Sequence, residues 1–205
     1  MTHTLRQLAA VLGVLGGVAL SAAYLIHPPS APPATVASTM WLWSHVGFMV
    51  SLLAGVFLLV VLVTEFVRAG GRWFGIAAFT ISVTSLIFVF GLDYSEVFIF
   101  PTLAVEFPAV VTKYGDGTSM PSVAFAFPAT GVLFVLGFII FSWQLEKYRV
   151  VSKGASWLTI VGTVVFGIGL SGLTPMIVVR VGSVIYGCGL ISLGFSLARR
   201  RSEVA

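Results

Sequence analysis

Apolar residues form six long runs along the chain, separated by short polar segments. The runs cover about residues 7–26, 41–63, 73–92, 122–143, 156–172 and 176–197, of which the fifth is the shortest. A helix needs about 20 apolar residues to cross the hydrocarbon core of a bilayer. Apolar residues lie on all sides of each run, whereas a strand of a transmembrane barrel would alternate apolar and polar positions. The pattern therefore predicts an all-α bundle, a single domain of six transmembrane helices.

The first run has two interpretations. Arg6 precedes it and small residues follow it, as they do in a signal peptide. The apolar core of a signal peptide has about 7–15 residues, and the stretch Leu8–Ile26 is longer than that. We therefore expect a retained transmembrane helix, with a cleaved signal peptide as the alternative.

The composition agrees with a protein that lies in lipid. Hydrophobic residues make up 58% of the 205 residues and charged residues only 9%, against roughly 25% charged residues in a soluble domain. The net charge of +4 does not indicate nucleic-acid binding, because the basic residues occur in short clusters between apolar runs. The single cysteine, Cys188, excludes an intramolecular disulfide and a cysteine-rich metal site. The lipid bilayer is therefore the first partner that the sequence predicts.

Basic residues at the ends of the runs predict which way the bundle faces. Lys113 is the one basic residue of the outer loops, and Arg180 lies inside the sixth run. Because Lys and Arg accumulate in cytoplasmic segments, we expect both termini in the cytoplasm. Glu65 and Arg68, at the inner end of the second run, are expected to form an exposed ion pair. The basic residues of the inner segments are Arg6, Arg68, Arg72, Lys147, Arg149, Lys153, Arg199, Arg200 and Arg201.

The two outer segments before the fifth run differ in character. Residues 27–40 contain four prolines and no charge, which predicts a stiff, extended connector. The segment 93–121 is long, and its first part is too apolar for a free loop. We therefore expect a structured outer cap, interrupted at Pro101 and Pro108. The tryptophans expected at the two membrane interfaces are Trp41 and Trp43 outside and Trp73, Trp143 and Trp157 inside.

Small residues recur within several of the runs. Helices in lipid pack closely where such residues face a neighbouring helix. Two interpretations stay open: packing within the chain, or a homodimer or larger membrane complex formed through the glycine-rich fifth and sixth helices. The glycines concerned include Gly13 and Gly17 in the first run, Gly162, Gly167 and Gly169 in the fifth, and Gly182, Gly187, Gly189 and Gly194 in the sixth.

Four ionisable side chains are predicted to lie at one depth near the outer surface. His45 and Arg180 each lie about 6 Å inside the outer boundary of their runs, at 1.5 Å per residue. Asp93 and Glu96 follow the third run and share one face if that helix continues for another turn, because residues i and i+3 are neighbours. Since an arginine within lipid is costly, we expect Arg180 to pair with one of these acids, with Glu106 of the outer cap as a third candidate.

This cluster has three interpretations. Arg180 and an acid could hold two helices together, or Arg180 could extend to the lipid headgroups. Alternatively, His45, Asp93, Glu96 and Arg180 could line an outward-facing pocket that binds a polar ligand or an ion. In such a pocket the arginine would bind an anion, and the acids and the histidine would bind a cation or protons. The third interpretation is a catalytic site.

A metal site is a further candidate for the same region. His27, His45 and Glu96 are residue types that bind zinc, but their spacing forms no local motif such as H-E-x-x-H. A haem between the two histidines is a further alternative. No motif of a nucleotide-binding loop or a serine hydrolase occurs in the sequence. We therefore predict no cofactor, with a metal ion as the alternative.

Two segments resemble a known group of proteins. Residues 41–55, "WLWSHVGFMVSLLAG", and residues 95–104, "SEVFIFPTLA", are similar to parts of uncharacterised prokaryotic membrane proteins with six helices and a domain of unknown function. In that group a Trp and a His open one helix, and a Glu-x-Phe-x-x-Pro segment follows the next. Trp41, His45, Glu96, Phe98 and Pro101 occupy those places. The resemblance covers about residues 41–110 and implies a multi-pass protein of a prokaryotic inner membrane, in which His45 and Glu96 belong together.

The sequence favours an integral membrane protein that binds or transports a small polar solute or ion through the outer pocket. A structural or accessory subunit of a larger membrane complex is the second hypothesis. An outward-facing, metal-dependent membrane enzyme is the third, although no residue is assigned a catalytic role.

Overall fold

All regular elements in the described residues are helices. The computed structural model describes residues 3–29, 32–115, 119–171 and 174–199. Six of the helices within these ranges are long and apolar enough to cross a membrane, which confirms the predicted all-α bundle of an integral membrane protein. These helices are α1 (His3–Ile26), α3 (Thr39–Arg68), α4 (Trp73–Phe98), α7 (Pro121–Lys147), α8 (Lys153–Leu170) and α9 (Met176–Arg199). The short helices are α2 (Pro33–Val36), α5 (Phe100–Glu106) and α6 (Pro108–Tyr114).

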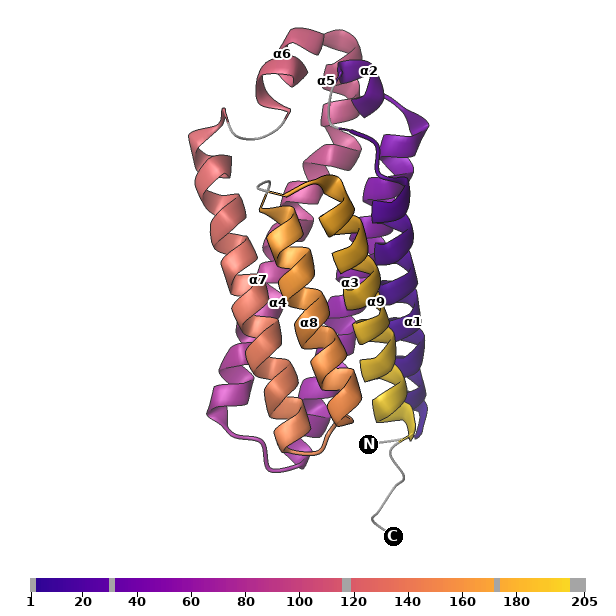
Figure 1. The fold of residues 1–205 in the computed structure, drawn as a ribbon, viewed down its shortest axis with the longest axis vertical. Coiled ribbons are helices and arrows are strands. Elements are labelled where there is room, and N and C mark those ends of the chain that lie inside the picture. Colours follow the sequence, from indigo (N-terminus) through magenta and orange to yellow (C-terminus); the bar gives the residue numbers. More distant parts are fainter. Residues whose placement is uncertain (1–2, 30–31, 116–118, 172–173, 200–205) are drawn as a thin grey trace.

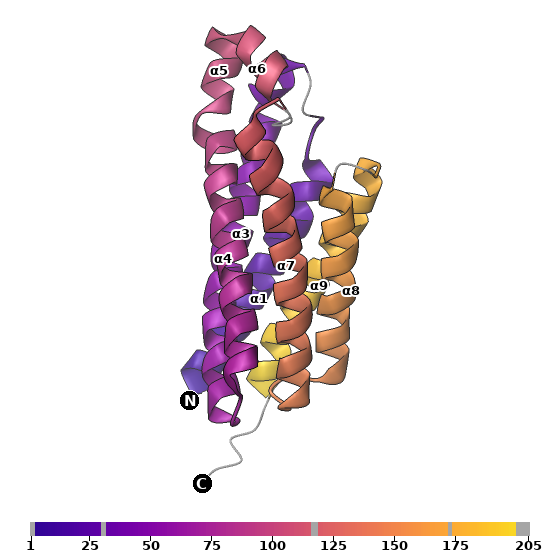
Figure 2. The same cartoon turned by 90° about the vertical axis from the view of Figure 1, so that its left-hand side faces the viewer.

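The six long helices form a closed ring. Each packs against the next along the chain, and α9 returns to pack against α1. The helices alternate in direction, so α1 begins and α9 ends at the same end of the bundle (Figures 1 and 2). We call this the terminal end, and we call the opposite end, which carries α2, α5 and α6, the cap end (Figure 1). The basic-residue pattern predicts that the cap end faces outward.

Local sequence signals set the helix boundaries. The Ser38 hydroxyl accepts a hydrogen bond of 3.2 Å from the Trp41 amide and caps the start of α3. Ser152 caps α8 in the same way, through a 3.3 Å bond from Ala155. After α3 ends, Gly70 adopts a φ of 82°, a left-handed conformation that glycine accepts without steric cost. The two serine caps each pair a backbone N–H that the start of a helix leaves without an intrahelical acceptor.

The predicted outer cap begins later than the expected residue 93. Helix α4 continues to Phe98, one turn and more beyond the predicted end at residue 92, so both outer acids belong to α4 itself. Pro101 and Pro108 do not merely interrupt the cap. Each lies in the first turn of a short helix, where its missing N–H leaves no hydrogen bond unmade. Residues 116–118 of the predicted cap and residue 172 of the predicted fifth span lie outside the described residues.

Glycines bring the backbones of α8, α9 and α1 together. A Cβ atom on Gly182 of α9 would lie 2.6 Å from the backbone of Phe166 on α8. A Cβ atom on Gly13 of α1 would lie 2.6 Å from the carbonyl oxygen of Leu190 on α9. No larger residue fits these positions unless a backbone moves. Glycines of α8 and α9 are thus used for packing within the chain. A homodimer or larger membrane complex through these helices stays a prediction.

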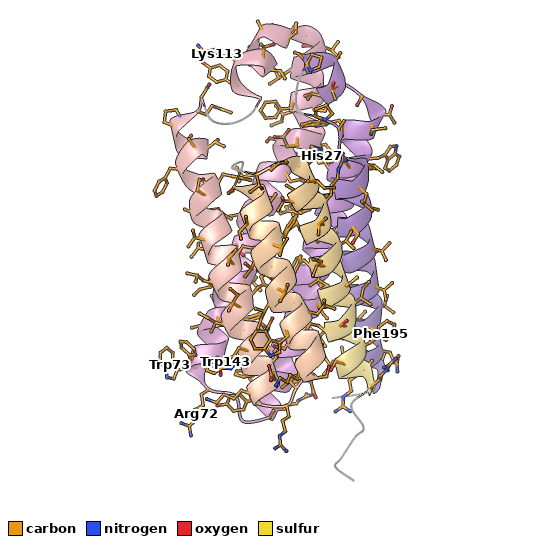
Figure 3. All side chains as sticks on the ribbon, viewed as in Figure 1. His27, Arg72, Trp73, Lys113, Trp143 and Phe195 are labelled. Carbon is orange, nitrogen blue, oxygen red and sulfur yellow. The ribbon has the colours of Figure 1, made fainter. Side chains whose placement is uncertain are left out.

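The exposed tryptophans lie near the two ends of the bundle. Trp73 and Trp143 lie at the terminal end, close to Arg72 (Figure 3), and their side chains are exposed, as an interfacial position requires. Trp43 is exposed on α3. Trp41 differs from the expectation, because it is only 3% exposed. It faces the inside of the protein, where it forms part of the site described next.

Candidate functional site

Three of the four predicted site residues line one cavity at the cap end. His45 enters from α3, and Asp93 and Glu96 enter from α4. The cavity has a volume of about 500 Å³, and His27, just beyond the end of α1, also lines it. Arg180, the fourth predicted residue, is not among the lining residues. The helices thus bring together the histidine and both acids but not the arginine.

The cavity wall combines acids with aromatic rings. None of the described residues that line it is a lysine or an arginine. Its charged groups at neutral pH can therefore come only from two carboxylates and two imidazoles. Aromatic side chains enter from α1, α3, α5, α6 and α7, namely Tyr24, Trp41, Phe48, Phe100, Tyr114 and Phe127. Such a wall places the carboxylates beside aromatic rings and supplies no lysine or arginine from its described residues to pair with them.

His45 is held in one orientation by its own helix. Its Nδ1 lies 2.9 Å from the carbonyl oxygen of Trp41, one turn earlier. A carbonyl oxygen can only accept a hydrogen bond, so Nδ1 carries the proton and donates it. The neutral imidazole then offers Nε2 as an acceptor. This atom lies 3.9 Å from Oδ1 of Asp93, too far for a direct hydrogen bond.

Asp93 and Glu96 each keep an oxygen without a hydrogen-bond partner. Asp93 is 5% exposed, and its Oδ2 has no partner among the described residues. Oε2 of Glu96 is also buried and has no hydrogen-bond partner among the described residues. A buried carboxylate oxygen is normally paired or hydrogen-bonded, since its desolvation is otherwise uncompensated. The two oxygens therefore mark a place where a donor or a cation is expected to bind.

Trp41 joins the helices that carry these groups. Its indole N–H donates a 3.0 Å hydrogen bond to the backbone carbonyl of Glu96, so it ties the start of α3 to α4. Its ring also lies 4.3 Å from the His45 ring, measured between centroids. On the cap side, Trp41 packs in a small apolar cluster with Val36, Ala104 and Val111 from the short helices. The cap is therefore built onto the same tryptophan that positions the site.

Arg180 has a different partner from the one expected. Its guanidinium donates a 3.2 Å hydrogen bond to the carbonyl oxygen of His27, which joins α9 to the end of α1. No ion pair between Arg180 and a carboxylate occurs within the described ranges. The expected pairing with Asp93 or Glu96 is therefore not formed. The positive charge also acts on His27: burial lowers the pKa of this imidazole, and the nearby Arg180 lowers it further.

The candidate metal ligands converge only in part. His27 and His45 have ring centroids 4.9 Å apart, and Glu96 lines the same cavity. Within the described residues, however, no group of three or more His, Cys, Asp or Glu side chains is arranged to hold a metal ion. The cavity thus contains ligand types for a metal without a ready coordination shell.

Sequence reasoning missed the aromatic part of the site. The sequence pattern predicts Trp41 at the membrane interface, although its position four residues before His45 places both on one face of a helix. That spacing was the available signal. Tyr24 and Tyr114 carried no comparable signal, because the distance between α1 and α6 in the sequence hides their proximity to the acids.

A second buried acid lies at the terminal end. Glu65 is only 3% exposed, which overturns its expected place in an exposed pair. Its carboxylate accepts a 3.0 Å hydrogen bond from Arg68 and a 3.4 Å bond from Arg6 on α1. The pair on α3 is thus extended to a third charged residue, which joins α3 to α1.

Comparison with known proteins adds no assignment to this geometry. No protein-family model, no curated protein and no solved structure matches the chain.

Proposed function

We propose that this integral membrane protein binds a small cation, most simply an ammonium compound, in the cap-end cavity. One observation carries the proposal: the carboxylate of Asp93 is buried beside Glu96 with a free oxygen, in a cavity whose described lining contains no lysine or arginine. A cation supplies the positive charge that the protein itself does not place there. The basic-residue pattern supports access from outside the cell.

The chemistry of the wall favours an organic cation. The lining includes three acceptors next to each other in the cavity, namely Nε2 of neutral His45 and the free carboxylate oxygens of Asp93 and Glu96. A protonated amine can donate hydrogen bonds to them, and a quaternary ammonium ion, which has no N–H, is attracted by the carboxylate charge. Trp41 and the other aromatic rings attract the same charge through their faces.

The two other roles have less support. The glycine faces that suggested an accessory subunit of a larger complex are used for packing within the chain. A metal-dependent enzyme would need more ligands than the described residues bring together. Movement of the cation across the membrane would be a further step, since α3 is apolar for most of the roughly 30 Å between His45 and Glu65.

The test is ligand-induced stabilisation of the purified protein. Tetramethylammonium chloride is added to the detergent-solubilised protein, with sodium chloride at equal ionic strength as the reference, and melting temperature and heat of binding are recorded. We expect stabilisation by tetramethylammonium, with affinity reduced at least about tenfold in Asp93→Asn and in Glu96→Gln, because each removes a negative charge that attracts the cation. Glu106→Gln is the matched control, since this exposed carboxylate of α5 does not line the cavity.

Two outcomes would contradict the proposal. The first is an effect of tetramethylammonium that does not exceed that of sodium, or that is the same in Asp93→Asn as in the unchanged protein. The second is stabilisation by zinc chloride alone that is removed by a chelator and by His45→Ala. That result would identify a metal site instead.

A further inference from the structure

A second, larger cavity lies between the long helices, next to the first, and exposed residues such as Val132 and Ile168 form part of its wall. Its volume is about 880 Å³, and residues of all six long helices line it. The lining is almost entirely apolar. Residues that carry polar side-chain atoms are few, among them Tyr24, Ser51 and Tyr186. Water molecules are not favoured in such a space, since an apolar wall offers them few hydrogen-bond partners.

The two cavities share part of their walls. Tyr24 of α1, Phe48 of α3 and Pro128 of α7 each line both of them. The cavities therefore adjoin, with the carboxylates at the cap end and the apolar space toward the middle of the bundle. Along α3 the combined space extends from Trp41 to Gly55, roughly 21 Å at 1.5 Å per residue.

This arrangement is polar and anionic at one end and apolar at the other. A small cation would fill only the first part and leave the adjoining apolar space without an occupant. A ligand with a charged head and an apolar tail would match both parts at once. Its head would meet Asp93 and Glu96, and its tail would lie against residues such as Leu52 and Leu86.

We propose that the ligand is a single-chain amphiphile with a cationic head, bound with the head at the acids and the chain in the apolar cavity. This inference rests on the proposed function, because it assigns the same cation site to the head group. Charge complementarity selects the cationic amphiphile over the acyl chain of a bilayer phospholipid, whose anionic phosphate would face two carboxylates. Occupation by such an acyl chain alone is an outcome of the test.

Gly131 makes the inference testable. It lies on α7 and lines the apolar cavity, and a Cβ atom there would meet nothing within 4 Å. A large side chain at this position can therefore enter the cavity without a clash at its base. Gly91 on α4 has the same open surroundings but lines neither cavity. Gly131→Phe and Gly91→Phe thus form a matched pair.

The experiment compares alkyltrimethylammonium ions of increasing chain length, from methyl to octyl, by calorimetric titration of the detergent-solubilised protein. In the unchanged protein and in Gly91→Phe we expect the affinity to rise by about three- to fourfold per methylene that enters the cavity. In Gly131→Phe the rise is expected to disappear, while the affinity for tetramethylammonium stays the same. Binding of tetramethylammonium also shows that the variant is folded, and Gly131→Leu is a smaller replacement with the same expected direction.

Each other outcome overturns a defined part of the argument. A flat chain-length dependence in the unchanged protein rejects the amphiphile and leaves the cation site in place. An equal rise in both phenylalanine variants shows that the chain lies in detergent or lipid, and a bilayer acyl chain then accounts for the cavity. Absence of tetramethylammonium binding that depends on Asp93 rejects the proposed function itself.

Discussion

The two ends of this bundle each bury an acid, but only one of these acids is paired with arginines of the chain. At the terminal end, Glu65 accepts hydrogen bonds from Arg6 and Arg68. At the cap end, Asp93 faces an imidazole nitrogen at 3.9 Å and retains an oxygen without a partner among the described residues. The first arrangement neutralises the carboxylate with groups of the chain itself. The second leaves that charge available beside a cavity of about 500 Å³.

The difference separates an interaction that stabilises the fold from one that is available to a ligand. A buried acid with two arginines has its desolvation compensated in the folded state, and the removal of one partner is costly. A buried acid without a cation reduces stability until a ligand compensates it. The contrast can be tested through the sign of the stability change when each acid is neutralised.

The largest effect is expected at the terminal end. Glu65→Gln removes a negative charge that lies 3.4 Å from the partly buried Arg6 and 3.0 Å from Arg68, so the free energy of unfolding should fall by about 3 kcal/mol. Thermal melting in one detergent at one scan rate measures this, with Glu106→Gln as the exposed control. A loss no greater than that of the control would remove the contrast between the two ends.

The opposite sign is expected at the cap end. Asp93→Asn replaces a buried carboxylate by a neutral group of similar shape, so the ligand-free protein should gain about 1 kcal/mol of stability. The same melting measurement, made without added ammonium compounds, gives the sign. A clear loss of stability would mean that the carboxylate is already compensated by the protein, for example through His45.

The smallest effect is expected at Arg180. Arg180→Gln removes the hydrogen bond to the His27 carbonyl, and the partly exposed position limits the loss to roughly 0.5–1 kcal/mol. Binding of tetramethylammonium should be unchanged, because Arg180 does not line the cavity. If the variant instead changes the affinity more than tenfold, Arg180 belongs to the site as the sequence first suggested.

Helix depth was a good guide to the residues that share the cap-end layer. His45 and the two acids were placed at one level by the rise per residue along separate runs, and they line one cavity. The same rise per residue predicts Arg180 at that depth, but it does not predict the direction in which the side chain extends from the helix. The guanidinium of Arg180 on α9 donates a hydrogen bond to the His27 carbonyl, which follows α1, the neighbour of α9 in the ring.

The surroundings of Trp41 and Glu65 show a second limit of the pattern. The sequence pattern predicts both at the surface, since Trp is common at membrane interfaces and i, i+3 ion pairs are common at exposed helix ends. Both are buried. The partner in each case comes from another helix: α4 supplies the acceptor for Trp41, and α1 supplies Arg6 for Glu65.

The sequence by itself determined the all-α class, the membrane character and the six long helices, because the length and composition of an apolar run decide whether it can lie in lipid as a helix. Only the tertiary structure decided which faces of the helices meet. Closure of the ring joins α9 to α1 and brings residues of separate helices to the walls of the two adjoining cavities. The physical reason is that runs apolar on all sides carry no mark of an inner face, so packing of small residues and single hydrogen bonds sets their rotation.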